Sequence, residues 1–181
     1  TLHNPQARQT ALAAQDGVLV KSGATTRRYL GTFFASAANQ TDDSLSKRFV
    51  WNYYNQVPRH MKVVETTDSW NYTTATFRQA NGSTANQLAY VQGLSDKPVY
   101  AEVFVSVFST SGGRAAVGIT KSSNVLLSDA QKMFTGGLDA NNTAGLGYAT
   151  YEGYPGIGYR TLVWLEHAGN TTGTTTWYGD N

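Results

Sequence analysis

Alternation of apolar and polar positions is clearest between residues 98 and 110. One parity carries Val or Ala at every position from 99 to 107, and the other carries Tyr100, Glu102, Phe104, Ser106 and Phe108. A period of two predicts a β-strand whose Val/Ala face lies against a core. The opposite face carries Tyr100, Phe104 and Phe108, which are too many aromatic side chains for a surface in contact with water. It therefore predicts cover from another sheet, a loop or a second subunit.

A second strand is predicted directly after this one. Ser111-Gly112-Gly113 has the composition of a tight turn, and the residues from 114 to 121 again alternate, with Ala115, Val117 and Ile119 on one parity. Two alternating segments on either side of a Gly-rich turn predict a β-hairpin.

Short strands separated by turn signals account for most of the remaining chain. About nine strands at this spacing predict an antiparallel, jelly-roll-like β-sandwich. A parallel βαβ sheet is excluded, because helical crossovers are missing. The further predicted strands are residues 17–21, 28–34, 61–66, 84–91, 146–151, 159–167 and 172–178.

One short helix is predicted at residues 43–55. Thr41, Asp42 and Asp43 offer capping side chains and negative charge at its start, and Pro58 ends the run. Leu45, Phe49 and Tyr53 follow at intervals of four residues. Residues 49–54 could also form a strand, because they are rich in aromatic and β-branched side chains.

Composition favours a domain with a neutral polar surface. Thr, Ser, Asn and Gly make up 66 of the 181 residues, whereas charged residues make up 14% and the net charge is +2. Nucleic-acid binding needs clustered Lys and Arg, so no nucleic-acid partner is expected. The absence of cysteine excludes disulfides and thiolate metal sites. No apolar run approaches about 18 residues, so no membrane insertion is expected.

The chain is predicted to form a single domain over residues 1–181. This length is too short for two ordinary domains with a linker, and no repeat, charge block or Pro-rich segment divides it. The first residue is Thr rather than Met, which suggests a processed protein or a C-terminal fragment of a longer one.

Catalytic chemistry has little support in the sequence. No nucleophile elbow or phosphate-binding glycine motif is present, and the Gly-rich residues 145–158 lack a strand-to-helix setting. His3, His60 and His167 are too scattered to predict a metal site, although a triad that assembles through space would leave no local signature. Glu65 and Asp68 could flank a sugar cleft. The oxygen-rich residues 139–142 are better explained as a turn than as a calcium loop. We therefore predict no catalytic residue, no metal site and no cofactor.

Aromatic residues among Gly, Asn and Thr are the better functional lead. Tyr and Trp combine a large apolar area with a polar group, which suits sugar stacking and protein contacts. Packing in a core or between subunits is the alternative, preferred for Trp51, Tyr53 and Tyr54. The candidate receptor-binding residues are Trp70, Tyr72, Tyr151 and Tyr154.

Three segments resemble a module that recurs in virion proteins of tailed bacteriophages. They are TTRRYLGT at residues 25–32, DSLSKRFVWNYYNQVPR at residues 43–59 and ETTDSWNYTTATFRQANG at residues 65–82. The likeness covers residues 15–92 well and the remainder only in general character. Such modules occur in tail-fibre or spike-tip proteins and in capsid decoration proteins, commonly as trimeric β-sandwiches.

The resemblance implies a virion location and a non-enzymatic role. We expect a homotrimeric tail-fibre or receptor-binding domain that contacts other virion proteins and attaches to a host-surface glycan or protein. A capsid decoration protein is the main alternative. An enzyme that degrades capsule sugars is a second alternative, disfavoured because such spikes are usually longer and built from β-helical repeats.

Overall fold

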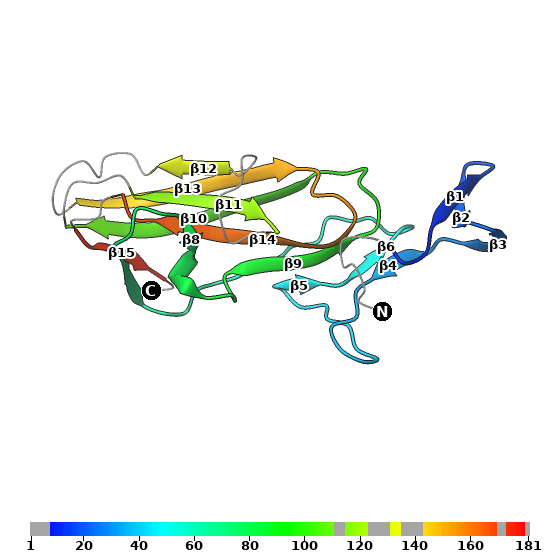
Figure 1. Ribbon diagram of the computed structural model, residues 1–181, viewed down its shortest axis with the longest axis horizontal. Coiled ribbons are helices and arrows are strands. Elements are labelled where there is room, and N and C mark those ends of the chain that lie inside the picture. Colours follow the sequence, from blue (N-terminus) through cyan, green and yellow to red (C-terminus); the bar gives the residue numbers. More distant parts are fainter. Residues whose placement is uncertain (1–7, 111–114, 123–130, 135–142, 170–172, 180–181) are drawn as a thin grey trace. The chain divides into compact units, whose positions relative to one another are not determined.

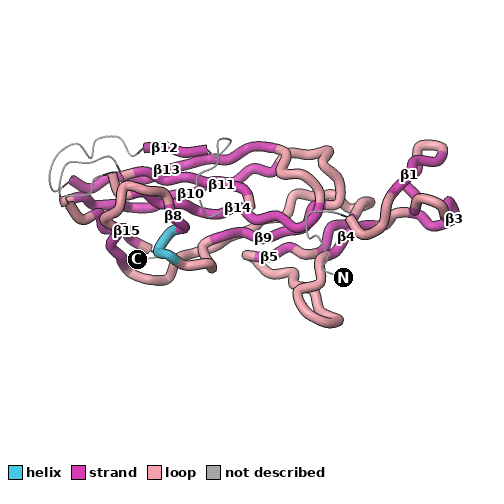
Figure 2. Tube along the Cα trace, viewed as in Figure 1, coloured by secondary structure: helices cyan, strands magenta, loops and turns pink. Residues whose placement is uncertain are grey.

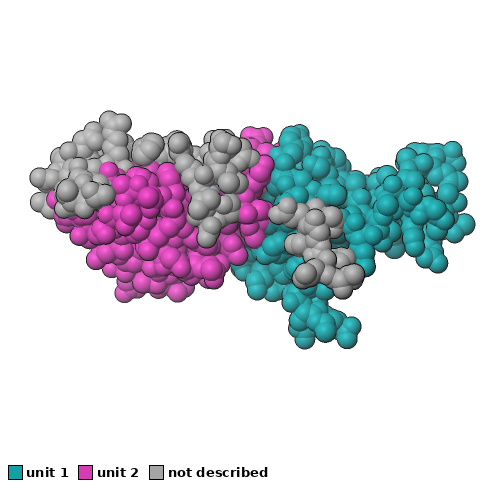
Figure 3. Space-filling view, in the orientation of Figure 1, with its two compact units in different colours: residues 1–61, 89–97, 154–160 teal, residues 62–88, 98–153, 161–181 magenta. Residues whose placement is uncertain are grey.

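The computed structural model describes residues 8–110, 115–122, 131–134, 143–169 and 173–179. Within them the fold is mostly β, with several antiparallel sheets consistent with a β-sandwich (Figures 1 and 2). The predicted fold class is confirmed. The chain divides into two compact units, coloured separately in Figure 3. Unit 1 holds residues 1–61, 89–97 and 154–160, and unit 2 holds residues 62–88, 98–153 and 161–181.

Unit 2 contains a four-stranded antiparallel sheet in the order β13-β10-β15-β7. Strand β10 (Val99–Ser109) pairs along its whole length with β13 (Thr143–Gly153), from Val99 opposite Gly153 to Ser109 opposite Thr143. The other edge of β10 pairs with β15 (Thr175–Tyr178), which in turn pairs with β7 (Ser69–Tyr72). Figure 1 shows β10 and β13 running side by side.

A second sheet of unit 2 is built around β11 (Ala116–Lys121), which pairs antiparallel with β12 (Gln131–Phe134) and with β14 (Gly158–His167). The short strand β8 (Arg78–Gln79) pairs with the end of β14. Strands β11 and β12 contact β13 of the first sheet, so the two sheets face each other. The core between them is nonpolar because alternate side chains of each strand point inward. Its most buried members include Val107, Val117, Leu165 and Trp177.

Unit 1 is made of shorter strands. Strands β1 (Leu12–Gln15), β2 (Val18–Lys21) and β3 (Ala24–Arg28) form one antiparallel sheet, and β4 (Gly31–Phe33) pairs with β6 (Val50–Asn52). Strand β5 (Lys47–Arg48) runs parallel to β9 (Gln87–Gln92), and β9 and β14 each have residues in both units. Aromatic side chains supply the packing of this unit: Tyr29 with Trp51 and Tyr53, and Phe34 with Phe49 and Tyr159.

The predicted helix at residues 43–55 is wrong. That segment forms β5 and β6 instead, and Phe49 is buried whereas Val50 is exposed, which is the alternation of a strand. The acidic residues do not cap a helix, because Asp42 pairs with Lys47 and Asp43 pairs with Arg48 and Arg59. The helical turn found in the described residues is a short 3₁₀ turn at Ala80–Gly82.

The predicted β-hairpin is also wrong in its pairing. Both strands exist, as β10 and β11, but they belong to different sheets. Both edges of β11 are occupied by β12 and β14, and β10 pairs with β13 along its whole length and with β15 at Ser106–Ser109, so β11 has no edge left for β10. The predicted turn at residues 111–113 lies outside the described residues.

Most other predicted strands are confirmed with shifted ends. Residues 17–21, 84–91, 146–151, 159–167 and 172–178 correspond to β2, β9, β13, β14 and β15, and the predicted strand at 28–34 overlaps the end of β3 and all of β4. Residues 61–66 form no strand. Outside the described residues lie His3 and the oxygen-rich residues 139–142.

Candidate functional site

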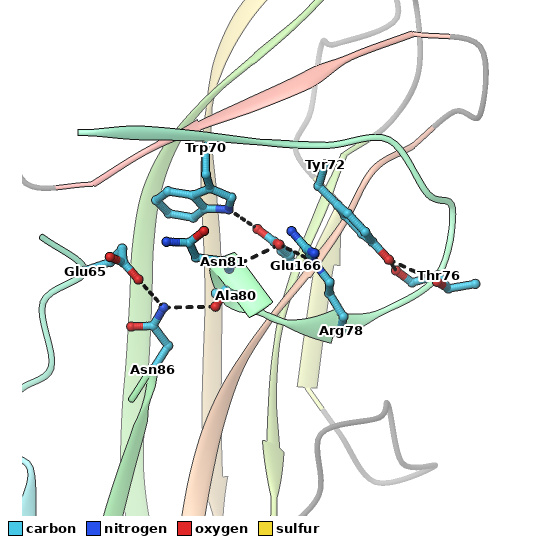
Figure 4. A network of polar contacts seen from close by, with 9 residues as sticks. All are labelled: Glu65, Trp70, Tyr72, Thr76, Arg78, Ala80, Asn81, Asn86 and Glu166. Carbon is cyan, nitrogen blue, oxygen red and sulfur yellow. Dashed lines mark hydrogen bonds and ion pairs between the residues drawn. The ribbon is translucent and has the colours of Figure 1, made fainter. Parts of the chain in front are cut away.

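A buried carboxylate, Glu166 on β14, is the centre of the main polar network of unit 2 (Figure 4). Its side chain is fully buried, and it accepts hydrogen bonds from Trp70 Nε1 to Oε2 at 2.6 Å and from Arg78 Nε to Oε1 at 2.7 Å. The backbone N–H of Asn81 also donates to Oε1, at 3.2 Å. Glu166 thereby connects β14 with β7, β8 and the 3₁₀ turn.

The environment of Glu166 acts on its pKa in two directions. Burial, the largest effect, raises the pKa of the Glu166 carboxyl, and the bonds from Trp70 and Arg78 oppose that increase without cancelling it. The Arg78 guanidinium lies 3.9 Å from the centre of the Tyr72 ring, so it pairs with both a carboxylate and an aromatic face. The Tyr72 hydroxyl donates in turn to the Thr76 carbonyl oxygen at 2.9 Å.

A second carboxylate, Glu65, belongs to the same region. It accepts from Asn86 Nδ2 at 2.6 Å and from the Thr67 backbone N–H at 3.0 Å, and Asn86 Nδ2 also donates to the Ala80 carbonyl oxygen (Figure 4). Burial raises the pKa of Glu65, but the hydrogen bonds from Asn86 and Thr67 outweigh that effect and lower it overall. Glu65 is thus held in its ionised form as a structural acceptor.

The network has the features of a structural link between strands rather than of a catalytic centre. Both oxygens of Glu166 are occupied by donors from the same unit, and the carboxyl has no exposed surface at which a substrate could meet it. No group of three or more His, Asp or Glu side chains within the described parts of the chain could hold a metal ion. Nor does any helix formed by those parts have the length and nonpolar character to cross a bilayer.

The four predicted receptor-binding residues do not share one surface. Trp70 and Tyr72 lie on β7 and Tyr151 on β13, and all three are buried in unit 2, so the expectation that these rings are exposed is wrong. They lie on the inward-facing parity of their strands: Trp70 and Tyr72 on β7, which was not among the predicted strands, and Tyr151 at the end of the predicted strand 146–151. Tyr154 belongs to unit 1 and is 60% exposed.

An exposed nonpolar surface lies elsewhere in unit 2, on the outer side of β10 and β13. Phe104 faces Tyr148 across the two strands, with ring centroids 4.6 Å apart, and Tyr100 and Leu146 lie on the same side of the sheet. Tyr100, Phe104 and Leu146 are 60%, 57% and 62% exposed. We call Tyr100, Phe104, Leu146 and Tyr148 the outer aromatic face.

Polar groups at one end of this face are already bonded to each other. Hydrogen bonding with Tyr148 and with Glu102, which accepts from the Tyr100 hydroxyl at 3.0 Å, raises the pKa of Tyr100 to about 12. The Tyr100 side chain is neutral at physiological pH. Because its hydroxyl is hydrogen-bonded to neighbouring residues of the same sheet, the face has few unpaired polar groups. Such a surface is suited to contact with another nonpolar surface.

Sequence reasoning found part of this face. The alternation along residues 98–110 indicated that Tyr100, Phe104 and Phe108 need cover, and Phe108 is half-buried. Leu146 was missed, because its exposure depends on the pairing of β13 with β10, which no local signal encodes. The Glu166 network was also missed. The donors to Glu166 lie 85 to 96 residues from it in the chain. The one sequence signal for the network is an isolated Glu within a nonpolar strand segment.

Comparison with known proteins adds no relative. No family model matches this sequence, and a search of curated proteins finds no match either.

Proposed function

We propose that this protein is a non-enzymatic structural module of a tailed-phage virion, which associates with copies of itself and attaches the particle to a host-surface polysaccharide or protein. The observation that carries the proposal is the outer aromatic face on β10 and β13. A tail-fibre or receptor-binding domain is the specific role we favour, with other virion proteins as neighbours.

Self-association is the favoured explanation for the outer aromatic face. Phe104 and Leu146 are more than half exposed although each would gain about 1.5–3 kcal/mol from full burial. The face occupies two eleven-residue strands in continuous register, which gives a rigid surface for a second copy. Closed symmetry would bury the same residues on each copy, as a trimeric fibre requires.

The virion assignment depends on the resemblance of residues 25–32, 43–59 and 65–82 to phage virion modules. A role without catalysis is supported by the Glu166 network, whose carboxyl has no exposed surface. Attachment to a host is proposed because a fibre module with exposed rings has a surface for a glycan or protein.

The assembly state tests the proposal directly. Size-exclusion chromatography with light scattering should give a trimer, or another closed oligomer, at micromolar concentration. Replacing Phe104 and Leu146 by Ser should shift the protein to monomer. Replacing Val57 and Val64, which are exposed and outside the face, by Ser should leave the oligomer intact. A wild-type protein that is monomeric at micromolar concentration would contradict the proposal.

Host binding and copy number separate the specific roles. The fluorescently labelled oligomer should bind host cells, and quantitative mass spectrometry of virions should find few copies per particle. Hundreds of copies on heads would instead favour a capsid decoration protein. Release of reducing ends from host capsule would overturn the non-enzymatic role.

A further inference from the structure

A groove with an uneven distribution of charge lies within unit 1. Its cavity volume is about 870 Å³, and residues 27–35, which run from the end of β3 through β4, line it continuously. Its cationic lining residues are Arg8, Lys21, Arg27 and Arg28, and none of its described lining residues is Asp or Glu. This concentration of positive charge contrasts with a whole chain whose net charge is only +2.

The groove cations are not neutralised by their own unit. The ion pairs formed by described residues of unit 1 join Asp42 to Lys47, and Asp43 to Arg48 and Arg59. Within the same described residues, Lys21, Arg27 and Arg28 have no ion pair. Arg27 and Arg28 are exposed, so both guanidinium groups keep their bidentate donors for an incoming anion.

Rings and neutral polar groups complete the lining. Phe33 and Leu30 are 71% and 69% exposed, and the rings of Phe34 and Tyr159 contact each other at a tilt, with centroids 4.6 Å apart. Neutral donors and acceptors also line the groove: Gln9, Thr10, Thr32 and Gln92.

Part of the groove wall is held in place before any ligand binds. Arg8 donates to the Gly93 carbonyl oxygen, and its guanidinium lies 5.2 Å from the centre of the Tyr29 ring. The Tyr29 hydroxyl is hydrogen-bonded to Thr32 Oγ1 at 2.5 Å. A wall fixed by its own contacts loses less freedom when a ligand binds.

We infer that this groove binds an anionic polysaccharide, a sugar polymer whose repeat carries carboxylate or phosphate groups. The inference rests on the proposed function, since it specifies the glycan that the module would attach to. Arginine forks match carboxylate and phosphate oxygens, ring faces match the apolar sides of sugars, and Gln and Thr match hydroxyl groups.

A glycan fits these observations better than a nucleic acid. Nucleic-acid binding surfaces neutralise many successive phosphates and carry a strong excess of Lys and Arg, whereas only 14% of this chain is charged. The cations of the groove are few, and neutral hydrogen-bonding side chains line it with them, which suits a repeat with one charge per several hydroxyl groups.

Binding of defined polymers to the full chain tests the inference. Biolayer interferometry would compare immobilised alginate, which carries carboxylates, and polyglycerol-phosphate teichoic acid, which carries phosphates, with neutral dextran and oligo-dT. We expect at least one of the two anionic glycans to bind, dextran not to bind, and the affinity to fall as salt is raised. The two anionic arms show which acid group is recognised.

Charge-matched variants assign the binding to the groove. Replacing Arg27 and Arg28 by Gln should weaken binding at least tenfold. Replacing Lys62 and Lys97, which are exposed and outside the groove, by Gln removes the same charge and should change it less than twofold. Circular dichroism would verify that both variants fold.

Several outcomes would overturn the inference: no binding to either anionic glycan at low salt, equal losses in the two double variants, or tighter binding to oligo-dT than to both glycans. The oligomeric state is measured separately. An oligomer that binds neither glycan contradicts this inference alone, whereas a monomer that binds one contradicts the assembly proposal alone.

Discussion

At the scale of single residues, Glu166 shows how a buried charge can join strands that are distant in the sequence. Its two oxygens accept from Trp70, Arg78 and the Asn81 backbone, so each donor also has its own bonding satisfied by the same carboxylate. Removing one partner of such a group costs more than the pair contributes, because the other polar groups stay buried without a partner.

Replacing Glu166 by Gln should lower the free energy of unfolding by about 2–4 kcal/mol. The amide group carries its own N–H donors, so in either orientation it faces Trp70 or Arg78 with a donor instead of an acceptor. Urea denaturation followed by tryptophan fluorescence measures the change. Asp68, which is exposed, provides the control: its replacement by Asn should change stability by less than about 0.5 kcal/mol. A loss below about 1 kcal/mol for the Glu166 variant would show that the network does little for stability.

Single residues were the hardest features to predict from the sequence. Trp70 and Tyr72 have the composition of binding residues, yet they are buried because β7 is the edge strand beside β15 and turns both rings inward. Whether a ring is inside or outside depends on strand pairing between residues about a hundred positions apart. Local composition does not contain that information.

At the scale of elements, periodicity predicted strands well and partners poorly. The alternation along β10 was sufficient to assign Val105 and Val107 to the core and Phe104 to the outer side. The partner of β10 was wrongly predicted, because nearness in sequence favours a hairpin whereas the long register with β13 offers more paired residues. Residues 43–55 were mistaken for a helix because spacings of four and alternation by two coincide at Phe49 and Tyr53.

The aromatic packing of unit 1 depends on a glycine in the chain after β9. A Cβ on Gly93 would collide with the Trp51 ring and the Tyr29 hydroxyl. The Gly93→Ala variant should therefore lose about 1–3 kcal/mol of stability, since both rings must shift. Ser95→Thr adds one methyl group at an exposed position of the same segment and should be nearly neutral. Thermal unfolding monitored by near-ultraviolet circular dichroism compares the two, and equal midpoints would contradict the packing described for Tyr29 and Trp51.

At the scale of the whole molecule, stability in acid is a sum of opposing contributions. The pKa of Asp43 and of Glu65 is lowered on folding, so these groups stabilise the protein above their ordinary pKa and lose that effect as pH falls. The pKa of Glu166 is raised, so its contribution is largest at low pH and declines as pH rises through the folded-state pKa.

His167 adds a contribution closer to neutral pH. Burial lowers its pKa from 6.5, and the ring packs against Phe77 with centroids 4.8 Å apart. The unfolded chain therefore takes up the proton first, and this contribution to stability is lost as pH falls below 6.5. In urea titrations between about pH 7 and pH 5.5, the wild type should lose more stability than His167→Gln loses over the same interval. Parallel pH profiles for the two proteins would contradict this role.

The unbroken register between β10 and β13 also limits how this protein can change length. Eleven consecutive pairs join the two strands without a bulge. Inserting one residue after Phe104, in the middle of β10, would reverse the direction of every side chain beyond it, turning Val105 and Val107 to solvent and Ser106 and Phe108 toward the core. Inserting two would restore the original directions. Natural length variation in this domain should therefore be confined to loops, or occur in the strands by pairs of residues.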